Sequence, residues 1–191
     1  MKRHVRGFTI VELSIVILVI GILATVVVVG YRGSQDRAHD LQIRDAATQV
    51  ADQIQLFASN AGHFPRGGYG STTAIGAGTE CIDGASGWFG SSIYTCTVEN
   101  TLVASGYLPS GFSVRLPQMP GYSAGTSSRA IMVYVANATT RLAMVYYYLA
   151  SPTAADTENF NDELTECGYN PAGVIGPRDS YGMRNGICLK Y

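Results

Sequence analysis

A long apolar segment near the N-terminus constrains this chain more than any other feature of its sequence. Leu13 to Val29 is a run of 17 residues without a charge, and a helix of that length rises about 25 Å. With residues 8–12 included, the segment approaches the roughly 30 Å hydrocarbon core of a bilayer. A single segment in lipid must satisfy its own backbone hydrogen bonds, so it must be helical there. We therefore predict a membrane-spanning helix at residues 8–30.

Charged residues before and within this segment indicate its orientation and its use. Lys2, Arg3 and Arg6 precede it, and by the positive-inside rule they keep the N-terminus in the cytoplasm and direct the rest of the chain outward. Glu12 lies inside the apolar run. A lone carboxylate is costly in lipid, so it indicates a functional role. A tolerated charge near one membrane face is the simpler alternative.

The pattern of Gly7, Phe8 and Glu12 followed by apolar residues to Val29 resembles the N-terminal signature of type IV pilins and pseudopilins. The resemblance implies that residues 1–7 are a leader peptide and that a prepilin peptidase cleaves between Gly7 and Phe8. It also implies that the new amine of Phe8 is methylated. Phe8 and Glu12 would then act in assembly, because the Glu12 carboxylate of one subunit meets the free amine of a neighbour. Such a charge pair is strong at low dielectric, and either partner alone is costly.

An ordinary secretory signal and a simple membrane anchor are the competing interpretations of the segment. A secretory signal needs an apolar stretch of about 7–15 residues followed by a small-x-small cleavage site. Here the stretch is longer, and the following sequence VVVVGYRGSQDRA offers no good site of that kind. A simple anchor leaves Glu12 unexplained.

Composition favours an extracytoplasmic protein without a nucleic-acid partner. The chain carries 13 basic and 14 acidic residues. Loss of the three leader cations would leave 10 basic against 14 acidic residues, a formal net charge of −4. The charge balance therefore gives no case for nucleic-acid binding. No catalytic constellation and no phosphate-binding glycine loop is visible, so we predict neither an enzyme nor a bound cofactor.

All four cysteines lie beyond the apolar segment, at Cys81, Cys96, Cys167 and Cys188. An even number outside the cytoplasm favours disulfides. Three pairings are open, and proximity along the chain favours Cys81–Cys96 and Cys167–Cys188. A zinc site is the rival, but the sequence has no C-x-x-C pair and no histidine near a cysteine. We therefore predict no metal site.

Residues 31–61 continue the helix with an amphipathic pattern. The apolar positions at helical spacing are Ile43, Ala46, Ala47, Val50, Ile54 and Phe57. Asp40 and Arg44 are spaced to form an i,i+4 ion pair on this helix. Gly62 suits a left-handed C-cap, and Pro65 prevents continuation.

Residues 62–191 are expected to form a globular head. Gly67 to Gly90 is rich in Gly, Ser and Thr and predicts an extended loop or αβ-type connection. Residue types favour strands at 112–116, 129–136 and 140–150, with a further strand in the tail at 181–191. An antiparallel sheet on the amphipathic half of the helix gives an α+β fold. The resemblance makes this architecture pilin-like.

An acidic run between residues 156 and 166 is the one candidate metal-binding segment. Its members are Asp156, Glu158, Asp162, Glu163 and Glu166. Oxygen-rich loops bind Ca²⁺, and some pseudopilins hold Ca²⁺ in a late loop, but the spacing matches no EF-hand. A solvated acidic loop is the interpretation that we favour.

The resemblance implies a structural subunit of a type IV pilus. Its partners would be copies of itself in a filament, the cytoplasmic membrane that holds the single-pass precursor, the prepilin peptidase and the pilus assembly platform. The assembled pilus would be extracellular, on the cell surface. A pseudopilin of a type II secretion or DNA-uptake system is the first alternative. A membrane-anchored extracytoplasmic binding or hydrolytic protein is the second.

Overall fold

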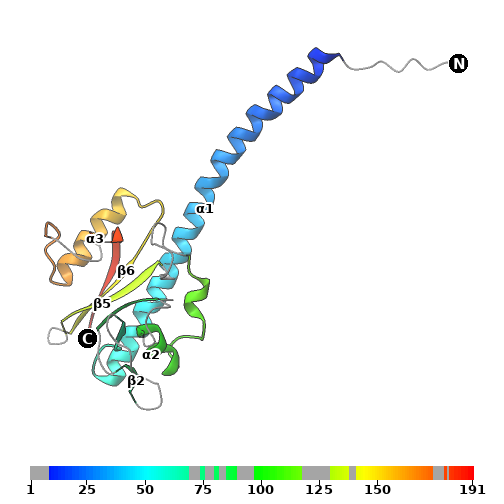
Figure 1. The fold of residues 1–191 in the computed structure, drawn as a ribbon. Coiled ribbons are helices and arrows are strands. Elements are labelled where there is room, and N and C mark those ends of the chain that lie inside the picture. The colour runs from blue at the N-terminus through cyan, green and yellow to red at the C-terminus, as the bar shows by residue number, and fades with distance from the viewer. Residues whose placement is uncertain are drawn as a thin grey trace. The chain divides into compact units, whose positions relative to one another are not determined.

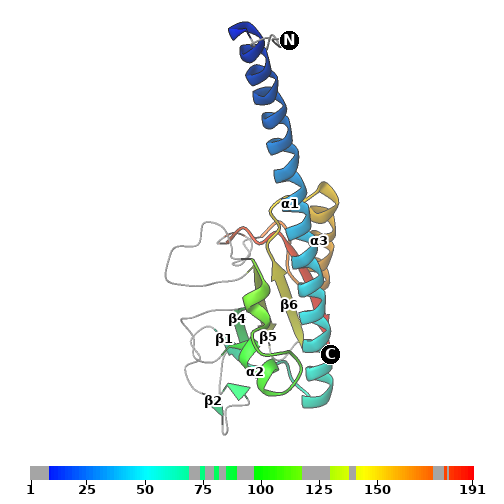
Figure 2. The same cartoon turned by 90° about the vertical axis from the view of Figure 1, so that its right-hand side faces the viewer.

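The computed structural model describes residues 9–68, 74–75, 80–81, 85–89, 97–117, 130–137, 141–173, 179 and 181–191. The chain divides into two compact units, Met1–Ala38 and His39–Tyr191. Figures 1 and 2 show the fold in two views.

Helix α1 (Ile10–Ala61) supplies residues to both units, and it confirms the predicted long helix. Its C-terminus has the predicted glycine cap. Gly62 adopts the left-handed conformation, with φ of 76°. Its N–H donates to the carbonyl oxygen of Ala58 at 2.9 Å, so the cap satisfies one of the last helical carbonyls.

A five-stranded sheet with the order β1-β4-β5-β6-β7 forms the centre of the second unit. Its strands are β1 (Gly67–Gly68), β4 (Ala85–Trp88), β5 (Ile131–Asn137), β6 (Leu142–Tyr147) and β7 (Asn185–Lys190). Strands β4 to β7 are antiparallel, whereas β1 runs parallel to β4. The predicted strands at 129–136, 140–150 and 181–191 are therefore confirmed, although each is shorter than predicted and β5 ends one residue later.

The prediction of a loop over Gly67 to Gly90 was wrong for its described part. Besides β1 and β4, this part contains a separate two-stranded sheet of β2 (Ala74–Ile75) and β3 (Glu80–Cys81). Glycine-rich composition lowers strand propensity, but pairing with β5 overrides it at β4.

The strand predicted at residues 112–116 was also wrong, because this segment forms a 3₁₀ helix, η1 (Phe112–Arg115). Phe112 and Leu116 are buried, while Val114 and Arg115 between them are exposed. That burial repeats after four residues, as on a helical face, and does not alternate as in a half-buried strand. Helix α2 (Val98–Ala104), capped by Thr97, precedes it.

The sheet lies between two helices of its unit, with α1 on one face and α3 (Ala154–Glu166) on the other (Figure 1). The predicted apolar stripe of α1 is buried. Its residues Val50 and Ile54 pack in one cluster with Val133 and Val145 of the sheet. Since one whole face of α1 packs in this cluster, the amphipathic half of the helix is part of the core of the head.

The acidic run at 156–166 is helical, so the prediction of a solvated loop was wrong. Thr153 and Asp156 form a capping box: the Thr153 side chain accepts from the Asp156 N–H, and the Asp156 carboxylate accepts from the Thr153 N–H. Phe160 and Leu164 are buried against the sheet. Asp156, Phe160 and Leu164 are four residues apart in sequence, which is the spacing of one helical face. The many acidic residues around them kept this helical pattern from being recognised.

Arg44 and Asp40 do not form the predicted local ion pair. Arg44 pairs with Asp156 instead, at 2.8 Å. The Asp40 carboxylate accepts the backbone N–H groups of Ala150 and Ser151 at 2.7 and 2.9 Å. Asp40 therefore connects α1 to the segment between β6 and α3, and Arg44 connects α1 to α3 itself. These tertiary partners displace the weak helical pair.

Candidate functional site

The first turn of α1 holds the Glu12 carboxylate in a fixed arrangement. Its Oε2 accepts hydrogen bonds from the backbone N–H and from the hydroxyl of Thr9, both at 2.8 Å. The Glu12 N–H donates in return to Thr9 Oγ1 at 3.2 Å. This reciprocal pattern is a capping box, and the sequence T-I-V-E carries its signature. The sequence interpretation of Glu12 missed this partner, although the spacing would have shown it.

The capping box sets the direction of the carboxylate. It folds back toward the N-terminal end of α1, where the free helical N–H groups provide partial positive charge. A cation at this end of the helix would therefore find the carboxylate already oriented. Gly7 and Phe8 lie outside the described residues, so cleavage and methylation at these positions remain predictions.

An apolar surface extends from the capping box along the helix. Every side chain from Ile10 to Val27 is exposed within this chain. Among the described residues, Ile10–Val27 is the one helical stretch that is long and apolar enough to cross a membrane, judged by length and composition alone. A surface of this size that its own chain leaves exposed indicates lipid or another protein as its partner.

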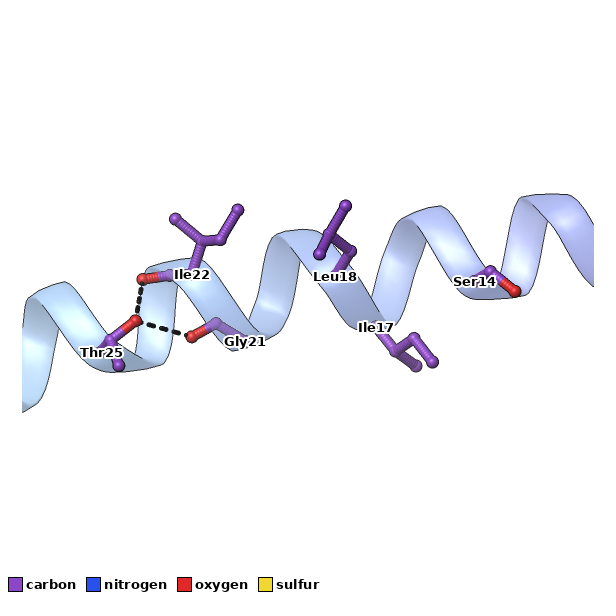
Figure 3. A pocket seen from close by; sticks show the side chains of 6 residues that line it. All are labelled: Ser14, Ile17, Leu18, Gly21, Ile22 and Thr25. Atoms are coloured by element: carbon purple, nitrogen blue, oxygen red, sulfur yellow. Dashed lines mark hydrogen bonds between the residues drawn. The ribbon is translucent and has the colours of Figure 1, made fainter.

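One face of this segment is shallowly hollowed because small residues lie along it (Figure 3). The residues that line the hollow are Ser14, Ile17, Leu18, Gly21, Ile22 and Thr25. The Thr25 hydroxyl is close to both the Gly21 and the Ile22 carbonyl oxygens, at 2.9 and 2.8 Å. The Ser14 hydroxyl donates to the Ile10 carbonyl oxygen at 2.8 Å. The hydroxyls are thus satisfied within the helix, and small residues of this kind allow helices to approach closely in an apolar setting.

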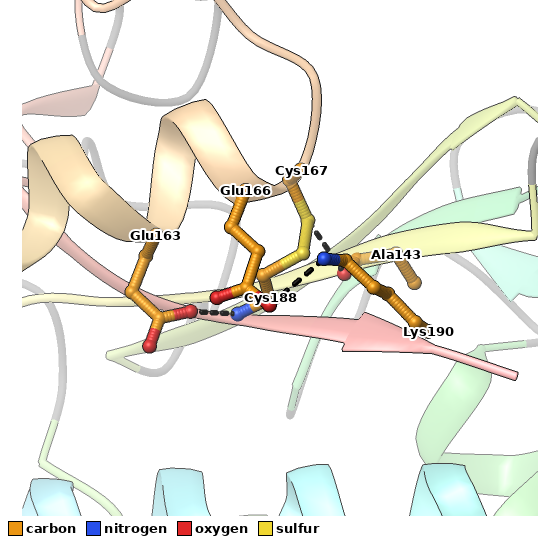
Figure 4. The surroundings of a disulfide bond; sticks show 6 residues. All are labelled: Ala143, Glu163, Glu166, Cys167, Cys188 and Lys190. Atoms are coloured by element: carbon orange, nitrogen blue, oxygen red, sulfur yellow. Dashed lines mark hydrogen bonds and ion pairs between the residues drawn. A yellow bond between two sulfur atoms is a disulfide. The ribbon is translucent and has the colours of Figure 1, made fainter.

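A disulfide between Cys167 and Cys188 joins the C-terminal end of α3 to β7, as predicted (Figure 4). The surroundings add two polar links between the same elements. Glu163 accepts the backbone N–H of Cys188, and Lys190 pairs with Glu166 at 2.8 Å. The predicted Cys81–Cys96 pair remains a prediction, because Cys96 lies outside the described residues.

Three of the five acidic residues of the run have protein partners. Asp156 pairs with Arg44, Glu163 with the Cys188 N–H and Glu166 with Lys190. In the part of the chain that the structure describes, no group of three or more His, Cys, Asp or Glu residues could hold a metal ion.

Comparison with known proteins agrees with the features of the first helix. Residues 2–28 match the family described as the prokaryotic N-terminal methylation motif. Over 65 residues the chain is 28% identical to the type II secretion system core protein G of Dickeya chrysanthemi, which covers 34% of this chain and 42% of that protein. The chain thus matches less than half the length of this relative, and no solved structure matches it. The chain therefore carries the N-terminal methylation motif and is similar over part of its length to a type II secretion core protein, and its long apolar helix followed by an antiparallel sheet is a pilin-like arrangement.

Proposed function

We propose that this chain is a structural subunit of a type IV pilus, which assembles through residues 8–30 after removal of residues 1–7 and methylation of Phe8. The observation that carries the proposal is the exposed apolar surface of Ile10–Val27, which begins at an oriented carboxylate. Lipid would cover this surface in the precursor. Helices of neighbouring copies would cover it in the filament, where apolar burial exchanges lipid contacts for protein contacts.

Glu12 would set the register between subunits. Cleavage before Phe8 creates an ammonium group, and the Glu12 carboxylate of a neighbour is a suitable partner for it. In an apolar surrounding either charge alone is strongly unfavourable, so the pair selects the arrangement in which both are matched. Leader removal would thereby be a precondition of assembly.

The experiment that tests this role changes Glu12 to Ala in the full chain and measures filaments sheared from cells. We expect membrane insertion to be retained and filaments to be lost. Thr9→Ala is the matched control, because it removes the side-chain half of the capping box and leaves the carboxylate. If Glu12 only caps the helix, the two variants will assemble equally poorly. If Glu12 meets an amine of a neighbour, Thr9→Ala will retain most of its filaments. Normal filaments from Glu12→Ala would refute the assembly role.

A pseudopilin role is the second candidate, and the similarity to a type II secretion core protein favours it. Deletion of the chain separates the two candidates. A pilus subunit is expected to be the dominant protein of long sheared surface fibres, which disappear on deletion. A pseudopilin is expected to give no such fibres, and its deletion should stop protein secretion or DNA uptake.

A further inference from the structure

The second unit carries two different exposed patches on opposite sides of α1. On one side η1 is attached to α1 through Gln42, whose Nε2 donates to the Arg115 carbonyl oxygen at 3.0 Å. Val114 is 71% exposed, and the Arg115 side chain beside it is exposed as well. Arg115 forms no ion pair with any described residue. An exposed apolar residue next to an unpaired cation is the first patch, which we name the η1 knob (Val114 and Arg115).

On the other side a groove of about 420 Å³ lies between α1, α3 and β7. Residues that line it include Arg44, Tyr147, Asn159, Asp162, Glu163 and Ile187. Figure 2 shows the green α2–η1 segment and the orange α3 on opposite sides of α1. Gln42 and Arg44 are two positions apart, which turns their side chains about 200° from each other on the helix. We name this second patch the α3 groove.

The α3 groove has an acidic balance. Its one cation, Arg44, is already paired with Asp156 at 2.8 Å. Glu163 accepts the backbone N–H of Cys188, which is a neutral donor and not a cation. Asp162 is exposed and has no ion-pair partner among the described residues. The groove therefore offers uncompensated carboxylates beside the apolar surface of Tyr147 and Ile187, which complements a cation next to an apolar side chain.

We propose that the η1 knob of one copy docks into the α3 groove of the next copy in the assembled filament, so that Arg115 faces Asp162. This inference rests on the proposed assembly of the chain and specifies which head surfaces meet. Contact between two different patches is heterologous, and it builds an open helical filament when the rotation between neighbouring copies does not close a ring. Gln42 and Arg44 lie in the same turn of α1, so both patches are attached to the same part of the helix. Each copy offers both patches, so the contact can repeat from one copy to the next.

Charge reversal in the full chain tests the proposal. We expect Arg115→Asp and Asp162→Arg each to reduce the yield of sheared filaments about tenfold, because like charges then face each other in every contact. The double variant restores an opposite pair and should return the yield to within about threefold of the wild type. Arg66→Asp and Glu158→Arg are matched controls, since these exposed residues belong to neither patch. Immunoblots of the membrane fraction show whether each variant accumulates.

Cysteine cross-linking gives a second readout that does not depend on assembly yield. Val114→Cys combined with Asn159→Cys should produce a ladder of oligomers on non-reducing electrophoresis of filaments, and neither single variant should go beyond a dimer. The contact would be overturned if the wild-type chain forms filaments, the Arg115→Asp and Asp162→Arg variants give the same yield as the wild type, and the double cysteine variant gives no ladder. That result would leave the proposed function standing. Absence of any filament from the wild-type chain would overturn both.

Discussion

Asp156 takes part in two contacts that hold α3 in the head. It closes the capping box of α3 with Thr153 and pairs with Arg44 of α1. Its side chain is 8% exposed, whereas that of Arg44 is 34% exposed. The Arg44 guanidinium holds the pKa of Asp156 well below its ordinary value of 3.8, with help from the hydrogen bonds of Thr153. One side chain thus connects the start of α3 to α1.

This pKa predicts a pH dependence of stability. The unfolded chain takes up the Asp156 proton first as the pH falls, because only the folded pKa is lowered. The stabilisation is therefore complete above the ordinary value and is lost progressively below about pH 5. We expect Asp156→Asn to lower the free energy of unfolding by about 1–2 kcal/mol at pH 7, an amount limited by the partial exposure of Arg44.

Unfolding midpoints of the full chain in detergent, measured between pH 7 and pH 3, test this prediction. The difference between the wild type and Asp156→Asn should shrink as the pH falls. Glu158→Gln is the control, because Glu158 is exposed on the same helix and its loss should change stability by less than about 0.5 kcal/mol. A difference that stays constant with pH would show that the pKa of Asp156 does not contribute.

At the scale of elements, β7 is packed so closely that it requires glycine at one position. A Cβ on Gly186 would lie 2.6 Å from Met144 Cε and 3.2 Å from both Phe160 Cε2 and the Val145 carbonyl oxygen. Met144 and Phe160 are themselves buried between the sheet and α3. These neighbours have little room to move, so the absence of a side chain at Gly186 allows α3 to approach the sheet.

We predict that Gly186→Ala lowers the free energy of unfolding by about 1–3 kcal/mol, the usual cost of overpacking a core. Denaturant titration of the full chain in detergent measures it. Gly33→Ala is the matched control, because a Cβ there meets no atom within 4 Å and the change favours the helix. Equal stability of Gly186→Ala and the wild type would mean that α3 and its Phe160 side chain can move away from the added Cβ without loss of stability.

The disulfide acts on the same pair of elements. Cys167 and Cys188 are 21 residues apart in sequence, and closing a loop of that size stabilises a fold by about 3 kcal/mol. Changing both residues to Ser should lower the unfolding midpoint accordingly, and either single change should have the same effect because it removes the same bond. A midpoint that all three variants share with the wild type would show that Glu163 and Lys190 suffice to hold β7 to α3.

For the molecule as a whole, secondary structure and burial were predicted correctly where a long periodic pattern exists, and wrongly in short or highly charged segments. The stripe around Ile54 was predicted because helical spacing persists over several turns, and it is buried. Residues 112–116 were too short for their period to be recognised. The charges of α3 concealed the apolar positions Phe160 and Leu164. Arg44 was assigned a neighbour on its own helix, because sequence alone does not show that the fold brings Asp156 within reach.

In the candidate site, too, some features were predictable from the sequence and others were not. Glu12 was recognised because a carboxylate in an apolar run is costly, and this argument needs no fold. Its partner Thr9 was missed although the capping-box spacing is local. The η1 knob and the α3 groove were beyond the reach of sequence, since Arg115 and Asp162 acquire their positions only when η1 and α3 pack on the head.

Leader removal is expected to precede assembly. Changing Gly7 to Leu should block cleavage, because the resemblance places the peptidase site after this glycine. The Phe8 nitrogen then stays in a peptide bond and provides no ammonium group for Glu12 of a neighbour. We expect the uncleaved chain to accumulate in the membrane, with Lys2, Arg3 and Arg6 still orienting it, and to form no filaments. Mass spectrometry of the membrane-bound chain shows whether residues 1–7 remain, and Val5→Leu is the control for a change within the leader away from the cleavage site. Filaments built from chains that retain residues 1–7 would contradict the requirement for a free amine, and would leave apolar burial along Ile10–Val27 as the sufficient cause of assembly.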